Sequence, residues 1–360
     1  MGKYKLINNV LGWIVFAIAS TVYLMTMEPT ASFWDCGEFI SSAYKLEVGH
    51  PPGAPFFMLT ANLFTQLASD PSTVAKMVNT MSALFSGLTI LFLFWSITHL
   101  ARKIMVKDGE EASLGQMITV MGSGLVGALA YTFSDTFWFS AVEGEVYAYS
   151  SLFTAVVFWL ILKWEAVADK PHADRWIVLI AYLMGLSIGV HLLNLLCIPA
   201  IVLVYYYKKF PNPTMKGTLV ALLASFAIVA LMMYGVVQGL VEVCGYFELL
   251  FVNVLGMPYN SGVFAYVIIV AGVLIWSIWE TMRDEIHPTR MKIAFILSVV
   301  LIGIPFIGSG YVLAVILTAA LSLYLFKSKK VDIKTLNTIL VCLMVVVVGY
   351  SSYALTLIRA

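Results

Sequence analysis

Long apolar runs separated by short polar segments dominate the chain. They lie at about 8–27, 76–100, 116–134, 149–165, 176–207, 217–237, 262–280, 292–326 and 335–357. Because about 20 helical residues cross the hydrocarbon core of a bilayer, each of the shorter runs predicts one transmembrane helix. The runs 176–207 and 292–326 are too long for one crossing, and both contain helix-breaking residues: Gly185, Gly189 and Pro199 in the first, and Gly303, Pro305, Gly308 and Gly310 in the second. We expect each to form two short helices joined by a tight turn. The chain is then an all-α membrane protein with about eleven transmembrane helices.

The distribution of basic residues supports this topology. With the N-terminus in the cytoplasm, 18 of the 21 lysines and arginines fall in cytoplasmic segments, and only Lys45, Lys76 and Arg359 fall outside. Cytoplasmic loops of membrane proteins carry such an excess. If either long run were a single helix, the basic loops beyond it would move outside. The cytoplasmic set is Lys3, Lys5, Arg102, Lys103, Lys107, Lys163, Lys170, Arg175, Lys208, Lys209, Lys216, Arg283, Arg290, Lys292, Lys327, Lys329, Lys330 and Lys334.

Composition narrows the class of protein further. Hydrophobic residues make up 61% of the chain and charged residues 11%, and the mean hydropathy is +0.92. A soluble domain usually has about 25% charged residues, so 360 residues of this composition predict one membrane domain over 1–360. The net charge of +1 gives no basis for a nucleic-acid partner.

Three outside segments are longer than turns, at 28–75, 135–148 and 238–261, and ten carboxylates lie on this side. The first segment contains two helical stripes, which predict two amphipathic helices lying on the membrane surface. One stripe consists of Phe39, Ile40, Ala43 and Tyr44, and the other of Phe56, Thr60, Leu63, Phe64 and Leu67.

Two motifs of the first segment are candidates for chemistry. Asp35 and Glu38 follow the first transmembrane run directly, and His50 lies in a stretch whose prolines and glycines restrict the backbone. Such a segment can hold a carboxylate and an imidazole in place beside the bilayer. The spacing of Asp35 and Glu38 also fits a capping box, in which both side chains only close the start of a helix.

Two further segments add polar side chains. The second outside segment contains Glu143, Glu145 and Tyr147, and the turn expected within 176–207 contains His191 and Asn194. The two glutamates fit a divalent-cation site together with Asp35 and Glu38, a metal-free sugar or acceptor site, or a solvated acidic loop. His191 is either a hydrogen-bonded core residue or a functional group near the outer surface.

Two motifs of the first outside segment resemble those of a known family. The segments Trp34-Asp35-Cys36-Gly37-Glu38-Phe39 and Gly49-His50-Pro51-Pro52-Gly53-Ala54-Pro55 are similar to the signature of bacterial multi-pass proteins common in Bacteroidetes. That family is related to a eukaryotic transmembrane O-mannosyltransferase acting on plexin-type receptors. The resemblance covers the N-terminal half and implies the C-type (GT-C) glycosyltransferase superfamily. Members are often longer, so this chain is expected to be a membrane core without their soluble C-terminal region.

The resemblance implies a reaction and its catalytic base. The donor would be a polyprenyl-phosphate sugar, with mannose as the sugar, and Asp35 would be the base, with Glu38 beside it. Since a phosphate departs without a proton, the enzyme needs one base for the acceptor hydroxyl and positive charge for the phosphate. Cations are scarce outside, so the candidates for donor binding are His50, His191 and Lys45, with Asn194 nearby. The candidates for acceptor or sugar binding are Glu143, Glu145, Trp34 and Tyr147.

The expected function is therefore inverting transfer of a sugar to Ser or Thr of a translocated protein. The predicted partners are the polyprenyl-phosphate donor, the protein acceptor and the lipid bilayer, with no cofactor and no assigned metal ligand, although a divalent cation stays open. The predicted location is a bacterial inner membrane, with the active site facing the periplasm. The alternative function is a transporter or flippase of a lipid-linked sugar. Transporters place ionisable groups or broken helices near the midplane of the bilayer. The breaks predicted in the two long apolar runs are compatible with this alternative.

Overall fold

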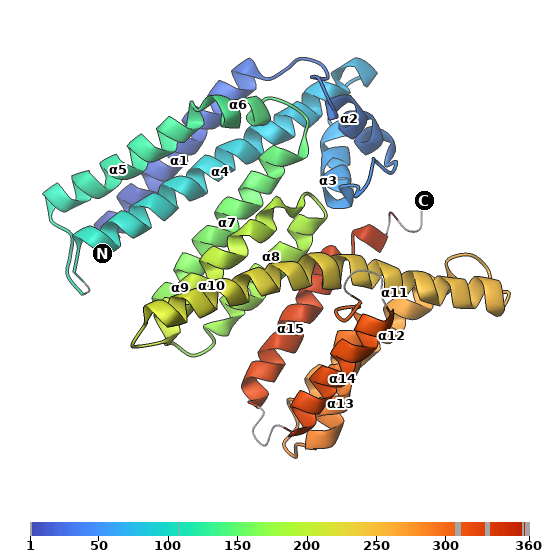
Figure 1. Cartoon of the computed structure of the whole chain (residues 1–360). Coiled ribbons are helices and arrows are strands. Elements are labelled where there is room, and N and C mark those ends of the chain that lie inside the picture. The colour runs from blue at the N-terminus through green and yellow to red at the C-terminus, as the bar shows by residue number, and fades with distance from the viewer. Residues whose placement is uncertain (1, 108, 307–310, 328–331, 355, 357–360) are drawn as a thin grey trace. The chain divides into compact units, whose positions relative to one another are not determined.

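The computed structural model describes residues 2–107, 109–306, 311–327, 332–354 and 356 (Figure 1). All regular secondary structure in these residues is helical, which confirms the all-α prediction. The chain forms two compact units, 1–176 with 183–197 and 349–360, and 177–182 with 198–348. Some residues used above for topology lie outside the described residues: Gly308, Gly310, Lys329, Lys330 and Arg359.

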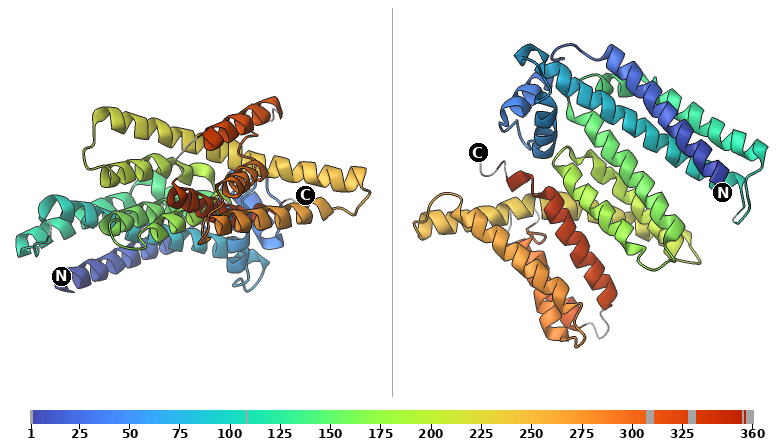
Figure 2. Two further views of the ribbon diagram at one scale, coloured as in Figure 1. Left: turned by 90° about the horizontal axis from the view of Figure 1, so that it is seen from below. Right: turned by 180° about the vertical axis from the view of Figure 1, so that it is seen from behind.

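Four long helices form the body of the first unit. They are α1 (Gly2–Thr26), α4 (Val74–Met105), α5 (Leu114–Thr132) and α7 (Val146–Val167). In Figures 1 and 2, α1, α4 and α5 lie side by side. Small residues allow this close packing, because a Cβ on Gly124 of α5 would lie 2.5 Å from a methyl group of Thr98 and 2.8 Å from the ring of Phe94, both on α4.

Shorter helices complete the first unit. They are α2 (Cys36–Lys45), α3 (Pro55–Thr65), the 3₁₀ turn η1 (Pro71–Thr73), α6 (Asp135–Ala141), the 3₁₀ segment η2 (Leu192–Cys197), and parts of α8 (Asp174–Ile188). Together α2 and α3 confirm the two helices predicted in the segment 28–75. Their apolar residues join a core with α4 and α7 that includes Phe39, Phe57, Met81 and Tyr149.

The apolar side chains of α2 and α3 divide between the protein core and the exposed surface. On α3, Phe57, Met58 and Ala61 are buried, whereas Leu63 and the following Leu67 are 69% and 70% exposed. On α2, Phe39, Ile40 and Ala43 are buried and Tyr44 is 44% exposed. Both helices pack against α4. Exposed apolar side chains are also what a helix on a membrane surface presents to lipid, so that position stays a prediction.

Both long apolar runs break as predicted. In the first, α8 ends at Ile188 and a turn precedes η2 and α9 (Ile198–Lys209). In the second, α13 (Pro288–Leu301) ends before Gly303, whose φ of 91° lies in the left-handed region that favours glycine, and α14 (Tyr311–Lys327) follows. Gly189 and Gly303 thus lie at or just beyond the ends of helices, whereas Gly185 lies inside α8.

The second unit contains a correction to the outside segment 238–261. Helix α10 (Met215–Ala230) continues through the π-helical segment η3 (Leu231–Val237), α11 (Gln238–Leu249) and η4 (Leu250–Val254), so the run 215–254 is helical over 40 residues. Its carboxylates are satisfied on helices. Glu242 accepts a bond from Tyr246, and Glu248 accepts the N–H groups of Asn260 at 2.6 Å and Val263 at 3.1 Å, capping α12 (Ser261–Glu280). Only 255–260 lies between the helices.

Helix α9 packs on α10, and α12 and α14 pack on α13. A core that includes Met291, Phe295 and Leu340 joins α13 and α14 to α15 (Ile333–Tyr350). Among the described residues, eight helices are long and apolar enough to cross a membrane. Helices α8, α13 and α14, with 15, 14 and 17 residues, are shorter. A total of eleven crossings needs these three and stays a prediction.

Candidate functional site

Asp35 lies immediately before the first residue of α2. Its backbone carbonyl accepts the N–H of Phe39 at 2.9 Å, but its carboxylate caps no N–H group of the helix. The chain reaches Asp35 through Trp34, whose φ of 61° is left-handed and costs about 1 kcal/mol for a residue other than glycine. The side chain of Trp34 is 90% exposed. The capping-box alternative is therefore wrong, and the carboxylate of Asp35 keeps its acceptor capacity.

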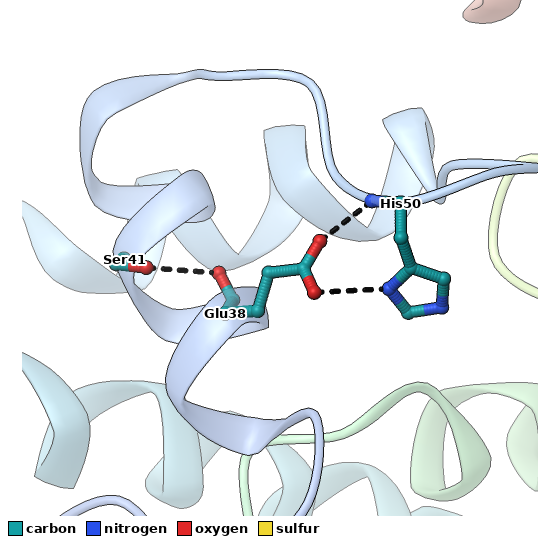
Figure 3. A network of polar contacts seen from close by, with 3 residues as sticks. All are labelled: Glu38, Ser41 and His50. Atoms are coloured by element: carbon teal, nitrogen blue, oxygen red, sulfur yellow. Dashed lines mark hydrogen bonds and ion pairs between the residues drawn. The ribbon is translucent and has the colours of Figure 1, made fainter.

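Glu38 binds His50 instead of the helix start (Figure 3). Oε1 accepts the backbone N–H of His50 at 2.6 Å, and Oε2 lies 3.1 Å from Nδ1 of the ring. Because a carboxylate can only accept, Nδ1 carries the proton of this bond. These two bonds lower the pKa of Glu38, which therefore stays ionised near neutral pH. Glu38 thus fixes both the backbone and the ring of His50.

Asp35 and His50 line a cavity of about 240 Å³ in the first unit. Four parts of the chain meet there: the first outside segment, the start of α7, the turn after α8, and the residues after α15. Two backbone hydrogen bonds hold the turn after α8 against the first outside segment. The carbonyl of Gly189 accepts the N–H groups of Phe56 at 2.7 Å and Phe57 at 3.2 Å. The full lining is Asp35, Phe39, His50, Pro52, Gly53, Ala54, Glu145, Val146, Tyr147, Ile188, Val190, His191, Leu192 and Tyr353.

Glu145 is the second carboxylate of the cavity. Burial raises its pKa to about 7, with further contributions from the negative charges of Glu143 and Asp35, while His50 lowers it. Glu143 itself is buried, and its carboxylate bonds with Ser32 and Cys36 rather than lining the cavity. Between them, a Cβ on Gly144 would lie 2.9 Å from Oδ1 of Asn79, so this turn packs tightly against α4.

His191 contributes a hydrogen-bond donor to the cavity wall. Its Nδ1 accepts the backbone N–H of Leu193 at 3.1 Å, so the proton of the neutral ring is on Nε2. Burial lowers the pKa of His191, which keeps the ring neutral at physiological pH. The ring of Tyr147 lies 5.3 Å from it, centroid to centroid. His191 can therefore donate one hydrogen bond to an anionic ligand without carrying a charge itself.

Residues 35–214 match the family model described as "Protein O-mannosyl-transferase TMEM260 N-terminal domain". This range is half of the chain and begins at Asp35. The chain belongs to this family.

Two relatives of this family are similar over the same half. The protein named "Protein O-mannosyl-transferase TMEM260" of Mus musculus is 28% identical over 174 residues, which are 48% of this chain and 22% of that protein. The protein of the same name from Dictyostelium discoideum is 25% identical over 187 residues, which are 50% of this chain and 21% of that protein. The chain thus spans about a fifth of the length of these relatives. No solved structure matches.

Not all of the residues predicted from the sequence meet at the cavity of this TMEM260-family chain. Asp35, His50, Glu145, Tyr147 and His191 do, and Glu38 supports them through His50. Lys45 lies at the other end of α2, exposed, 3.9 Å from Glu47. Asn194 is fully buried and donates to Ser187 at 2.9 Å. Neither lines the cavity, and the same holds for Trp34 and Glu143.

Sequence reasoning missed two residues that shape the site. The hydroxyl of Tyr353 lies within hydrogen-bond distance of two carbonyl oxygens, those of Gly53 at 3.2 Å and Ile188 at 3.3 Å. Asn79 of α4 is fully buried and donates to the carbonyls of Glu28 at 2.7 Å and Thr30 at 3.0 Å. An amide near the start of the apolar run 76–100 was the available signal for Asn79. Tyr353 gave none, because an aromatic residue near a membrane boundary is ordinary.

One group of side chains has the composition of a metal site. Ligand atoms of Asp35, Glu38 and His50 all lie within 4.8 Å of one another. Carboxylates with one imidazole suit Mn²⁺ or a similar cation. Glu143, which the sequence grouped with Asp35 for this purpose, points its carboxylate to Ser32 and Cys36 instead. A cation bound by Asp35 and Glu38 would therefore take His50 as a further ligand, and not the pair Glu143 and Glu145.

The raised pKa of Glu145 predicts a pH-dependent effect of Glu145→Gln on stability. Between the unfolded value near 4.5 and the folded value of about 7, the folded chain binds more protons than the unfolded chain, so its stability falls as pH rises through this window. Glutamine cannot ionise. We expect the variant to be more stable than the wild type at pH 8.5, by about 1–3 kcal/mol, and nearly equal at pH 5.

Thermal unfolding of the two purified proteins at both pH values measures this difference. Glu47→Gln, at an exposed position, is the matched control and should show no such pH dependence. An equal change in stability for Glu145→Gln at both pH values would contradict the raised pKa of Glu145 and burial as its cause.

Proposed function

We propose that this chain transfers a sugar, mannose in the first instance, from a polyprenyl-phosphate donor to a Ser or Thr hydroxyl of a protein. The observation that carries the proposal is the carboxylate of Asp35, which is free of the helix cap and lines one cavity with His50 and His191. Membership of the TMEM260 family supports the class of reaction, because both relatives above are named protein O-mannosyl-transferases.

The proposed step is a single displacement. The acceptor oxygen forms a bond to the anomeric carbon, the bond from this carbon to the phosphate oxygen breaks, and its electron pair stays on the phosphate. The hydroxyl proton passes to Asp35, which acts as general base. Because one displacement occurs, the anomeric configuration inverts. His191 donates a hydrogen bond to the phosphate from Nε2, and His50 faces the same cavity under the control of Glu38.

The surroundings suit a lipid-linked donor. A second cavity of about 290 Å³ shares Gly53 and Ala54 with the first, and its apolar lining includes Leu46, Met58 and Leu59. The first isoprene units of the donor would occupy it. Phe33 and Trp34 are 83% and 90% exposed at the entrance to α2, and exposed aromatic residues favour the membrane interface. The carboxylate beside them would then lie at the depth of the donor phosphate.

We place this site on the outer face, the periplasmic face in a bacterium, because basic residues gather at the other ends of the helices. The test supplies a radiolabelled polyprenyl-phosphate mannose and a water-soluble Ser/Thr peptide to sealed vesicles of opposite orientation. The peptide cannot cross the bilayer, so we expect labelled peptide only when it shares a compartment with the first outside segment. Donor movement across the bilayer without labelled peptide would indicate the flippase instead, and labelling from the opposite face would reverse the topology.

A further inference from the structure

A separate cavity of about 400 Å³ lies at the other end of the first unit. It is formed by the start of α1 and the ends of α4 and α7, whereas the candidate active site lies beyond the end of α1 and includes the start of α7. Helix α1 has 25 residues, and at 1.5 Å per residue its ends are about 37 Å apart. The two cavities are therefore near opposite ends of a helix that is long enough to cross the hydrocarbon core.

Three cations line this cavity of about 400 Å³. They are Lys5 of α1, Arg102 of α4 and Lys163 of α7, and no carboxylate pairs with any of them among the described residues. A neighbouring lysine shows the contrast, since Lys103 pairs with Glu165 and does not line the cavity. Three positive side chains brought together by three helices repel one another unless an anion lies between them. Their arrangement favours an anionic ligand.

Aromatic rings in the wall position two of these cations. The guanidinium of Arg102 lies 4.7 Å from the ring centroid of Tyr4, and the ammonium of Lys163 lies 4.7 Å from that of Trp159. These contacts hold the two cations in place without neutralising their charge.

From these observations we infer that the cavity binds a phosphate-bearing anion. A guanidinium and two ammonium groups suit phosphate oxygens. Two sources carry this chemistry: the headgroup of an anionic phospholipid in the leaflet at this end, or a soluble phosphate. Tyr4, Trp95 and Trp159 are residue types that gather where headgroups lie. The site is distinct from the proposed donor site and does not depend on the proposed transfer reaction.

The experiment uses the purified full chain in nanodiscs of equal phosphatidylglycerol and phosphatidylcholine. Native mass spectrometry measures the phosphatidylglycerol that stays bound. We expect Arg102→Gln with Lys163→Gln to lower retention of this lipid at least about tenfold, since each charge-assisted bond contributes on the order of one decade. Lys103→Gln with Lys170→Gln removes the same charge at the same end, outside the cavity, and should retain the lipid.

A second arm separates the two sources. Labelled inorganic phosphate is offered to the protein in phosphatidylcholine alone, and saturable binding that the cavity variant loses would assign a soluble anion. If the cavity variant fails to fold, Lys5→Gln with Lys163→Gln keeps Arg102 on Tyr4 and serves in its place. Equal lipid retention by the wild type, cavity and control variants, together with no phosphate binding, would overturn the inference.

Discussion

Asp35→Asn should lower sugar transfer about 10²–10⁴-fold while the fold is retained, because general-base catalysis usually contributes a factor of this size. Asparagine keeps the size of the side chain but cannot take up the hydroxyl proton. The structure removes the main ambiguity of this substitution, since the carboxylate makes no cap hydrogen bond to α2 whose loss would destabilise the helix. The measurement is turnover of the purified variant with labelled donor and peptide, beside its thermal unfolding midpoint.

Glu38→Gln tests whether Asp35 acts as the base alone or together with Glu38. Glutamine can still accept the backbone N–H of His50, so a loss well below that of Asp35→Asn is expected if Asp35 alone is the base. Equal losses for both, with inhibition by a chelator and recovery on adding Mn²⁺, would instead assign Asp35, Glu38 and His50 to a metal. Near wild-type turnover of Asp35→Asn would refute the base itself.

His191→Ala should weaken binding of the donor about 10–100-fold, because a hydrogen bond to a charged group contributes about 1.5–3 kcal/mol. The bond between Nδ1 and the N–H of Leu193 leaves Nε2 as the donor, and alanine has no replacement for it. His191→Gln restores an N–H group of similar reach and should recover part of the affinity. Competition by unglycosylated polyprenyl phosphate measures this directly, since that ligand carries the phosphate without the sugar.

A structural explanation of the His191 effect predicts another pattern. If His191 only supported the turn after α8, then glutamine and alanine would lower stability together and competition by polyprenyl phosphate would not change. His172→Ala, in the exposed turn before α8, is the control for loss of a histidine and should bind the donor normally. Unchanged competition with His191→Ala in a folded protein would remove this residue from the phosphate site.

The sequence predicts the positions of the helices well because the bilayer imposes a simple length rule. The breaks within 176–207 and 292–326 were expected from glycines and from the basic loops, and the structure has them at 189–191 and at Gly303. The apolar run ends at about 237 in the sequence because Glu242 and Glu248 interrupt it, whereas the helix continues to residue 254. Each has a partner on or beside the helix, a hydroxyl or backbone N–H groups, that cannot be seen in the sequence.

The sequence identifies candidate polar side chains, but it does not show which of them lie together. Polar residues in an apolar chain are few, so Asp35, His50 and His191 stood out. Which of them meet depends on packing between distant segments. Glu143 and Glu145 are two residues apart, yet one bonds to Ser32 and Cys36 and the other lines the cavity. Tyr353 reaches the loop of Gly53 across 300 residues, and local sequence carries no trace of that contact.

The carbonyl of Gly189 holds the segment of His50 against the turn of His191 through two main-chain bonds. A Cβ at position 189 would lie 2.5 Å from Oγ of Ser352 and 2.8 Å from Cβ of Phe56, so only glycine fits without displacing them. Main-chain bonds do not depend on the side chains that surround them. Substitutions of the surrounding side chains therefore leave these two bonds in place, and with them the spacing between the segment that follows His50 and the turn that precedes His191.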